Sequence, residues 1–401
     1  MVAAYFAYQL IDLLFAAAVI APVARRVDRG GRSLRRTLLL TIPIAGALLL
    51  LFALLCAAWL HEPFGALAWA WFGRAWSIRF LGVGAAAWGG LLLLPALAAW
   101  RAWHGHSGAA ARGGTLLWLL ASLALFAEMA LLEPNRLVVE RRDVALSDWP
   151  AGAPPLRIVV LADLQSPRFG AREARVIEFV RELAPDLIVL PGDLAAQSLD
   201  DGAALDCARR ILRGSAVPLG TFAVNGDVDP LVAGGVADVV RETPARLLDN
   251  GAVRLVHPPA TERRDVTPVQ IELAGFDPAD PARFAAALAM PPQAAVRIAL
   301  VHQPEHVVRL GPAGFDLVIA GHTHGGQIVL PGIGPLVTLS PLPDAIDAGG
   351  LHRHSGTQLV VSRGIGCEAG FAPPLRLFCP PEITLITVSG PPAAPAEADS
   401  R

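Results

Sequence analysis

The segment DLVIAGHTHGGQ, residues 316–327, joins a short apolar run to two histidines that stand one residue apart between glycines. The run LVIA is short, apolar and partly β-branched, which is typical of a buried strand. His322 and His324 follow directly behind its carboxyl end. Glycine permits a tight backbone turn, so both imidazoles can point into one place. The segment therefore predicts a strand that delivers two imidazoles to a site.

Four other apolar runs end in a polar residue in the same way: RIVVLAD, LIVLPGD, TFAVNGD and RIALVH. In an open α/β sheet, binding sites form outside the carboxyl ends of the strands. The pattern therefore predicts one crevice in which three carboxylates and three imidazoles meet. The residues that these runs add to the two histidines are Asp163, Asp193, Asp227 and His302.

Helical and strand-like segments alternate after residue 155. Residues 171–183 read AREARVIEFVREL, in which Val176, Val180 and Leu183 recur at the spacing of one helical face. Further strand-like runs are VQIELAGF, TQLVVS and EITLITV. This order predicts an α/β domain over residues 156–389. A polar connector is expected at 134–155 and a disordered tail at 390–401.

Three carboxylates buried together would repel one another and take up protons unless cations neutralised them. Two divalent ions would do so, and mixed carboxylate and imidazole ligands suit Mn, Fe or Zn. One aspartate behind one strand is usually a turn residue, so the ordered series carries the prediction. His257, His352 and His354 stand outside the series and are expected to be ordinary polar residues.

The order of these residues resembles the calcineurin-like metallophosphoesterases, in particular bacterial members that are membrane-attached or exported. The family pattern is D-x-H, G-D, G-N-H-[DE], a lone H and G-H-x-H, and the resemblance covers roughly residues 155–388. GHTHGGQI, HQPE, VSRGIG and PPEITL also look like that branch. The resemblance implies a two-sheet α/β sandwich with metals at the carboxyl ends of its strands.

The resemblance also implies a role for each matching residue. One metal would be held by the D-x-H pair, the G-D aspartate and the last histidine. The other would be held by the same aspartate, the third motif, the lone histidine and the first histidine of G-H-x-H, so that Asp193 bridges. Asp193, Asp227 and His324 are expected to serve catalysis. The implied ligands are Asp163, Gln165, Asp193, Asp227, His302, His322 and His324.

Two motifs depart from the family pattern. Gln165 stands where a histidine ligand is expected, and an amide oxygen is a weaker ligand. The third motif reads NGDVD. An ungapped register places Asp227 on the family asparagine, Val228 on the histidine and Asp229 on the last acid. A register shifted by one places Asn225 on the asparagine instead. The histidine that contacts phosphate is missing in both registers.

The departures leave two functions open. One is a working enzyme with an altered ligand set, which hydrolyses phosphodiester or pyrophosphate bonds. The other is a membrane sensor that binds phosphate ligands without turnover. The ungapped register adds a carboxylate to the site, whereas decay would more often remove one, so the sequence favours the enzyme.

The first third of the chain is unusually apolar. Hydrophobic residues make up 54% of the whole chain, against about 45–50% in an ordinary soluble domain. Four stretches reach the length of about 20 residues that a membrane span needs: 3–24, 37–60, 80–100 and 115–132. Residues 1–133 are therefore expected to form a four-helix transmembrane region.

Arginine distribution predicts the orientation of these spans. Arginine-rich loops stay in the cytoplasm, which would place the first and third loops inside and the phosphoesterase domain outside. Three arginines behind the fourth span argue against this. The arginines of the first loop are Arg25, Arg26, Arg29, Arg32, Arg35 and Arg36, those of the third are Arg101 and Arg112, and those behind the fourth span are Arg136, Arg141 and Arg142.

The expected location in the cell membrane suggests which substrates and partners the protein would bind. A site at a membrane surface suggests lipid-linked phosphate esters as substrates. The net charge of −2 offers no electrostatic basis for binding nucleic acid. Outside the cytoplasm, Cys367 and Cys379 would be able to form a disulfide; two free thiols are the alternative.

Overall fold

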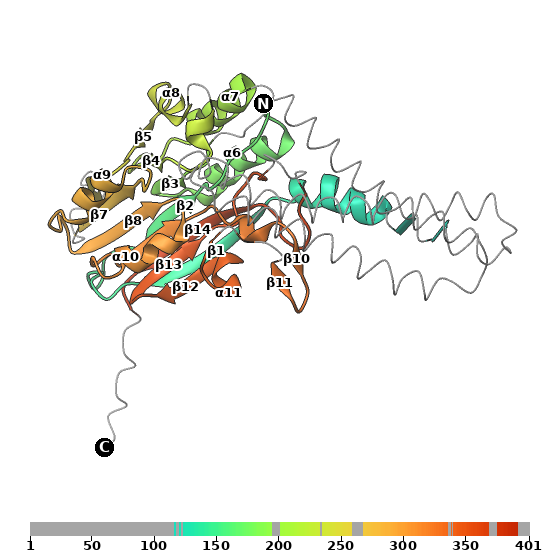
Figure 1. Ribbon diagram of the computed structural model, residues 1–401. Helices are drawn as coiled ribbons and strands as arrows, with labels where there is room; N and C mark the ends of the chain where they lie inside the picture. The colour runs from blue at the N-terminus through green and yellow to red at the C-terminus, as the bar shows by residue number, and fades with distance from the viewer. Residues whose placement is uncertain are drawn as a thin grey trace, which may run out of the picture. The chain divides into compact units, whose positions relative to one another are not determined.

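The structure is a computed structural model, which describes residues 116–391 apart from 118–119, 122, 195–200, 233–234, 259–267, 336–337, 339 and 369–374. Contacts divide the chain into two compact units. The first comprises residues 1–126 with 371–373, and the second comprises residues 127–370 with 374–401. The second unit holds two β-sheets and the helices that cover them (Figure 1).

The first sheet has the strand order β1-β14-β2-β3-β4-β5 within the described residues. Neighbouring strands are parallel except at the β14–β2 pair, which is antiparallel. The carboxyl ends of β2, β3 and β4 therefore lie at one edge. The strands are β1 (Val138–Ala145), β14 (Glu382–Ser389), β2 (Leu156–Val160), β3 (Leu187–Pro191), β4 (Thr221–Val224) and β5 (Ala245–Leu247).

The second sheet has the order β12-β13-β9-β8-β7-β6. Its inner strands β13, β9, β8 and β7 are parallel, and its edge strands β12 and β6 are antiparallel to their neighbours. A short hairpin of β10 (Val329–Leu330) and β11 (Gly334–Pro335) stands apart. The strands of the sheet are β12 (Gly350–His354), β13 (Thr357–Val361), β9 (Leu317–Ala320), β8 (Val296–Val301), β7 (Val269–Phe276) and β6 (Gly251–His257).

The two sheets pack face to face because their strands are apolar on both sides. Side chains alternate between the faces of a strand. In β2, Ile158 and Val160 enter the core shared with the second sheet, whereas Val159 packs on the opposite face. In β8, Ile298 enters the shared core, and Ala299 packs on the outer face. Strands buried on both faces read as continuous apolar runs, which is how they appear in the sequence.

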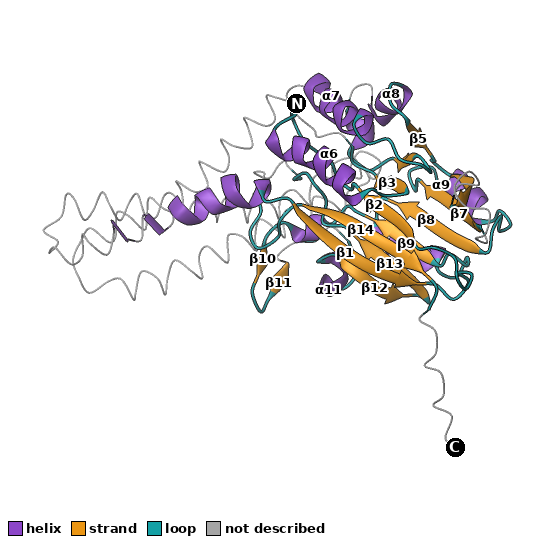
Figure 2. Cartoon of the chain, turned by 180° about the vertical axis from the view of Figure 1, so that it is seen from behind, coloured by secondary structure: helices purple, strands orange, loops and turns teal. Residues whose placement is uncertain are grey.

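Helices cover both outer faces of the sandwich (Figure 2). The outer core of the first sheet takes residues from α6 (Ala171–Leu183), α7 (Asp201–Arg213) and α8 (Gly235–Arg241). That of the second sheet takes residues from α9 (Pro281–Leu288) and α10 (Val307–Leu310). A further short helix, α11, spans Asp344–Asp347. The two-sheet α/β sandwich expected from the resemblance is therefore confirmed.

Local expectations met different outcomes. The helix over residues 171–183 is confirmed as α6, which buries Val176, Val180 and Leu183. The expectation of a connector at 134–155 was wrong, because residues 138–145 form β1 and pair with β14. β1 reads VVERRDVA and lies at an edge with one face partly exposed, so it lacks the apolar run that marks an inner strand. The tail from residue 392 onward lies outside the described residues.

The expected membrane spans are mostly beyond the described part of the chain. The first three lie outside it, and residues 115–132 are described only in part. Within the described residues, no helix has both the length and the apolar character needed to span a bilayer.

Candidate metal centre

The carboxyl ends of five strands meet at one place in the sandwich. Three triads of ligand atoms lie there, each with its atoms within 4.8 Å of one another. His302 belongs to two triads, and Asp193 also belongs to two, so the three groups form one continuous cluster. The triads are Asp227–His302–His322, Asp163–Asp193–His302 and Asp193–His324–Glu368. Six of the seven ligands expected from the sequence belong to these triads, and the seventh, Gln165, donates from its Nε2 to Asp193 Oδ2 at 2.7 Å.

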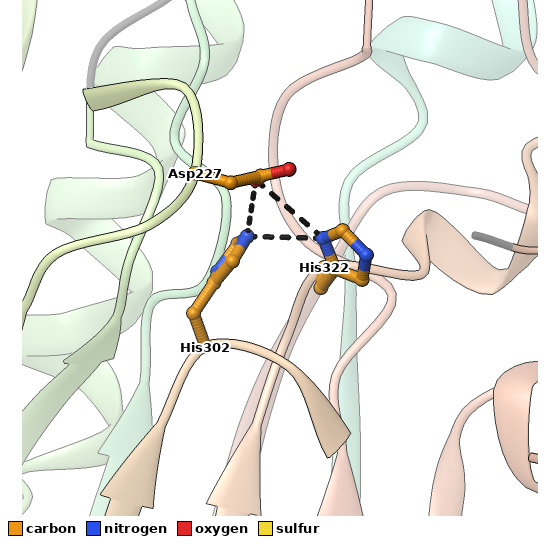
Figure 3. Close-up of side chains that lie close together, drawn as sticks. All are labelled: Asp227, His302 and His322. Carbon is orange, nitrogen blue, oxygen red and sulfur yellow. Dashed lines mark hydrogen bonds and ion pairs between the residues drawn. The ribbon is translucent and has the colours of Figure 1, made fainter. Parts of the chain in front are cut away.

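The triad of Asp227, His302 and His322 joins loops behind β4, β8 and β9 (Figure 3). His302 Nε2 lies 2.9 Å from Asp227 Oδ1 and 3.1 Å from His322 Nδ1. His302 Nδ1 lies 2.8 Å from the carbonyl oxygen of Pro191, which only accepts hydrogen bonds. Nδ1 therefore carries a proton, and Nε2 is the nitrogen turned toward the cluster.

A cation site is consistent with the protonation of this triad. Burial lowers the pKa of His302, but the hydrogen bond to Asp227 and the negative charges of Asp227 and Asp163 together outweigh that effect and raise the pKa to about 9. Partial burial raises the pKa of Asp227, but its hydrogen bonds from His302 and His322 bring it below the usual range. The carboxylate thus stabilises positive charge on the imidazoles. A proton and a metal ion compete for the same ligand nitrogen.

Asp163 and Asp193 are buried carboxylates at the ends of β2 and β3. Burial raises the pKa of Asp163 to about 6, although the nearby His302 opposes the shift. Burial also raises the pKa of Asp193 well above its usual value, and repulsion from Asp227 and Asp229 adds to it. Carboxylates in this position need a compensating positive charge to stay ionised. The clustering therefore favours divalent cations.

Backbone strain is concentrated in the residues expected as ligands. Asp163, Asp193 and Gln165 have positive φ angles of 47°, 52° and 21°. His322 and His324 have φ angles of 71° and 48°. Residues other than glycine rarely adopt this region, and each such residue costs about 1–3 kcal/mol. The surrounding fold imposes these conformations, which is typical of sites where function sets the geometry.

Asp229 ties the loops behind β3 and β4 together. Its buried carboxylate accepts hydrogen bonds from the backbone of Asp193, Leu194 and Gly226 at 2.8–2.9 Å. Gly226 is required there, because a Cβ at this position would lie 2.0 Å from Asp193 Oδ1. Asp229 thus positions Asp193 rather than joining the triads.

The structure distinguishes the two registers of the NGDVD motif. The side-chain amide of Asn225 donates to Asp249, away from the triads. Asp227 instead lies in a triad with His302 and His322. The geometry agrees with the ungapped register, in which Val228 stands where the resemblance leads us to expect a histidine. The backbone N–H of Val228 donates to Asp193 Oδ1 at 3.0 Å, so the backbone of Val228 lies at the edge of the cluster.

His324 and Gln165 each present a buried polar atom with no hydrogen-bond partner. These atoms are His324 Nε2 and Gln165 Oε1. Burial, followed by the nearby charge of Arg376, lowers the pKa of His324 well below its usual value, which keeps the ring neutral. The lone pair of a neutral, unpartnered imidazole nitrogen is available to bind a metal ion. The residues present therefore fit divalent cations.

Sequence reasoning missed two residues beside the cluster. Glu368 lies in a triad, and Arg376 is fully buried. Arg376 donates to the carbonyl oxygens of Gly366, Cys379 and Arg363. Both residues lie in or beside motifs that had marked the resemblance, VSRGIG and PPEITL. Charged residues next to those motifs were the available signal.

The other histidines and cysteines of the described residues lie outside the triads. His257 contacts the carbonyl oxygen of Pro155, and His352 contacts that of Gly349. Of the two alternatives for Cys367 and Cys379, the structure has the free thiols, and both are buried. Cys379 Sγ instead lies 3.3 Å from the carbonyl oxygen of His324, to which it donates.

Comparisons with known proteins bear on this cluster. No family model matches the chain. Phosphodiesterase YaeI of Escherichia coli is 30% identical over 276 residues, which is 67% of this chain and 94% of that protein. Metallophosphoesterase YkuE of Bacillus subtilis is 28% identical over 262 residues, or 64% and 87% of the two chains. A transmembrane protein with a metallophosphoesterase domain from Danio rerio is 26% identical over 68% of this chain and 61% of its own length.

Proposed function

Because the chain belongs to the calcineurin-like metallophosphoesterases, a family of metal-dependent hydrolases, we propose that it hydrolyses phosphodiester or pyrophosphate bonds with two divalent metal ions. One observation carries the proposal: the buried carboxylates and imidazoles form overlapping triads joined through His302 and Asp193. The relative from Escherichia coli, which carries the name phosphodiesterase, supports the choice of bond.

The proposed ligand sets follow the triads and the family pattern. One ion would be held by Asp193, Asp227, His302 and His322. The other would be held by Asp163, Gln165, Asp193 and His324, so that Asp193 bridges. Carboxylate and imidazole ligands suit Mn, Fe or Zn. When bound, such ions lower the pKa of water and neutralise charge on the phosphoryl oxygens.

The chain's own residues supply orientation and charge. Pro191 holds the ring of His302 by its carbonyl oxygen, and the backbone N–H of His322 donates to both carboxylate oxygens of Asp163 at 3.1 and 3.2 Å. Asp227 is half exposed, with 50% of its side chain accessible, whereas the other two members of its triad are buried. A substrate would therefore approach from the side of Asp227.

A panel of substrates tests this function. The purified full-length protein supplied with Mn²⁺ is expected to hydrolyse bis(4-nitrophenyl) phosphate and a pyrophosphate diester. A chelator is expected to abolish turnover, and added Mn²⁺ to restore it, because bound metal ions would lower the pKa of the attacking water and neutralise charge on the phosphoryl oxygens. Release of 4-nitrophenolate measures the first reaction, and release of phosphate monoesters measures the second. Stoichiometric metal binding without turnover of any substrate would instead establish a sensor that binds phosphate without hydrolysis.

We further propose that residues 1–133 form a multi-pass region in the cell membrane, with the phosphoesterase domain outside the cytoplasm and lipid-linked phosphates as substrates. The apolar stretches and the arginines of the first expected loop support this. So does the relative from Danio rerio, which is named as a transmembrane protein.

The topology has its own test. An alkaline phosphatase reporter fused after residue 401 is expected to be active in cells, since this reporter folds only after export. A cytoplasmic reporter at the same position serves as the control and is expected to be inactive. The opposite pattern, with activity from the cytoplasmic reporter alone, would place the domain inside the cell.

A further inference from the structure

We propose that Glu368 is an additional metal ligand of the second cation site. Its carboxylate compensates for Gln165, a weaker ligand that stands at the position of the family's D-x-H histidine. This inference rests on the proposed two-metal function. Neither the family pattern nor the sequence motifs assign a role to Glu368. Its carboxylate lies within 4.8 Å of the ligand atoms of Asp193 and His324, so the three side chains make a site on their own.

Backbone contacts deliver Glu368 to this position. The loop behind β13 runs along the loop behind β2. Ile365 N–H donates to the carbonyl oxygen of Ala162 at 3.0 Å, and Gly366 N–H donates to that of Asp163 at 2.7 Å. Gly366 permits the approach, because a Cβ there would lie 2.6 Å from the carbonyl oxygen of Leu164. Glu368 follows two residues later and is therefore held beside Gln165.

The same loop is held from its other side. Arg376 Nη2 donates to the carbonyl oxygen of Gly366 at 2.6 Å, and its Nη1 donates to that of Cys379 at 3.1 Å. The side-chain amide of Gln327 donates to the carbonyl oxygen of Glu368 at 3.4 Å. The loop that carries Glu368 is thus hydrogen-bonded on both sides, and the position of Glu368 follows from its fold.

Gln165 lies between the two carboxylates of this site. Its Nε2 donates to Asp193 Oδ2 at 2.7 Å and to Glu368 Oε2 at 3.4 Å. The amide nitrogen thereby positions both carboxylates, while Gln165 Oε1, which has no hydrogen-bond partner, stays available to the same ion. The unpartnered Nε2 of the buried His324 points to a ligand that this set still lacks. Two carboxylates, that imidazole and a cation would satisfy one another.

Charge explains why a glutamate serves here. Replacing histidine by glutamine removes a strong neutral ligand, and a carboxylate restores affinity through its charge. When ionised, Asp163, Asp193, Asp227 and Glu368 together carry four negative charges, which two divalent cations would balance. A site with one imidazole and several carboxylates also favours Mn²⁺ over Zn²⁺ relative to a site with two imidazoles. The exchange therefore sets metal preference as well as affinity.

Metal binding tests the assignment without relying on activity. Full-length protein freed of metal is titrated with Mn²⁺ by calorimetry, and bound metal is counted after dialysis. The unsubstituted chain is expected to bind two ions. Glu368→Gln is expected to keep the ion held by Asp227, His302 and His322. Its affinity for the other ion is expected to fall by more than the about 10–100-fold that loss of an outer-shell partner costs. Gln165→His in the Glu368→Gln chain is expected to restore the second ion and to shift preference toward Zn²⁺.

Matched variants separate the possible failures. Glu140→Gln makes the same change on β1, where the glutamate pairs with Arg363, and is expected to bind two ions. Circular dichroism and melting temperature check the fold, and Glu368→Asp, which keeps the charge but shortens the reach, is expected to weaken the second ion less. An unsubstituted chain with two ions but no turnover would defeat the proposed hydrolysis and leave the ligand assignment standing. A folded Glu368→Gln chain that binds both ions with unchanged affinity would overturn the assignment.

Discussion

Asp193→Asn is expected to abolish hydrolysis and to reduce bound metal below two ions per chain. Asp193 belongs to two triads and is the residue proposed to bridge both ions. An amide oxygen carries no charge and holds one ion at best. The loss in kcat should exceed the ~10²–10³-fold that removal of one oxyanion-stabilising donor costs. Single-turnover assays with Mn²⁺ and metal analysis of the dialysed protein measure both effects.

Although Asp193→Asn should lose activity, we expect it not to lose thermal stability in the metal-free state. The pKa of Asp193 is raised by burial and by repulsion from Asp227 and Asp229. Removal of its charge relieves that repulsion, so the metal-free variant should melt at a temperature no lower than the metal-free parent. Asp238→Asn on the surface of α8 is the control and should leave activity and metal content unchanged. Near-normal activity of Asp193→Asn would show that this residue does not bridge the ions.

Val228→His is expected to flatten the dependence of rate on the leaving group. In the ungapped register, Val228 stands where the resemblance leads us to expect a histidine that would protonate the departing oxygen. The backbone N–H of Val228 donates to Asp193 Oδ1 at 3.0 Å. General-acid assistance is typically worth about 10²–10⁴-fold in rate. The unsubstituted enzyme should therefore be slow with alkyl monoesters, whose leaving groups need a proton. The leaving groups of aryl diesters and pyrophosphates depart as stable anions, so the rates for these substrates should be reduced least.

A series of phosphate esters with leaving groups of graded pKa measures this slope. Asp227 adds to the preference, because a further carboxylate lowers the positive charge of the metal pair and weakens attraction for a dianionic monoester more than for a monoanionic diester. Val228→Ile, which keeps an apolar branched side chain, is the matched control and should retain the steep slope. Alkyl monoesters hydrolysed by the unsubstituted enzyme as fast as aryl diesters would mean that another group, such as His352 or His354, supplies the proton.

Several features of the fold were predictable because they are local. Apolar runs longer than a turn identified the inner strands, among them β2, β3, β8 and β9, since strands buried on both faces must be apolar throughout. The face of α6 followed from its helical spacing. Edge strands carry no such signal. β1 keeps charged residues on a partly exposed face, and its pairing with β14 links residue 138 to residue 382.

For the candidate centre, the sequence by itself determined which polar residues follow the inner strands, because the apolar runs mark where each buried strand ends. The tertiary structure alone decided the rest. It places Asp227 and not Asn225 beside the histidines, since Asp249 takes the asparagine amide. It also brings Glu368 to Gln165 across 203 positions of the chain. No periodicity in a sequence encodes a contact of that range, because it arises only when the loops behind β2 and β13 hydrogen-bond to one another in the closed sandwich.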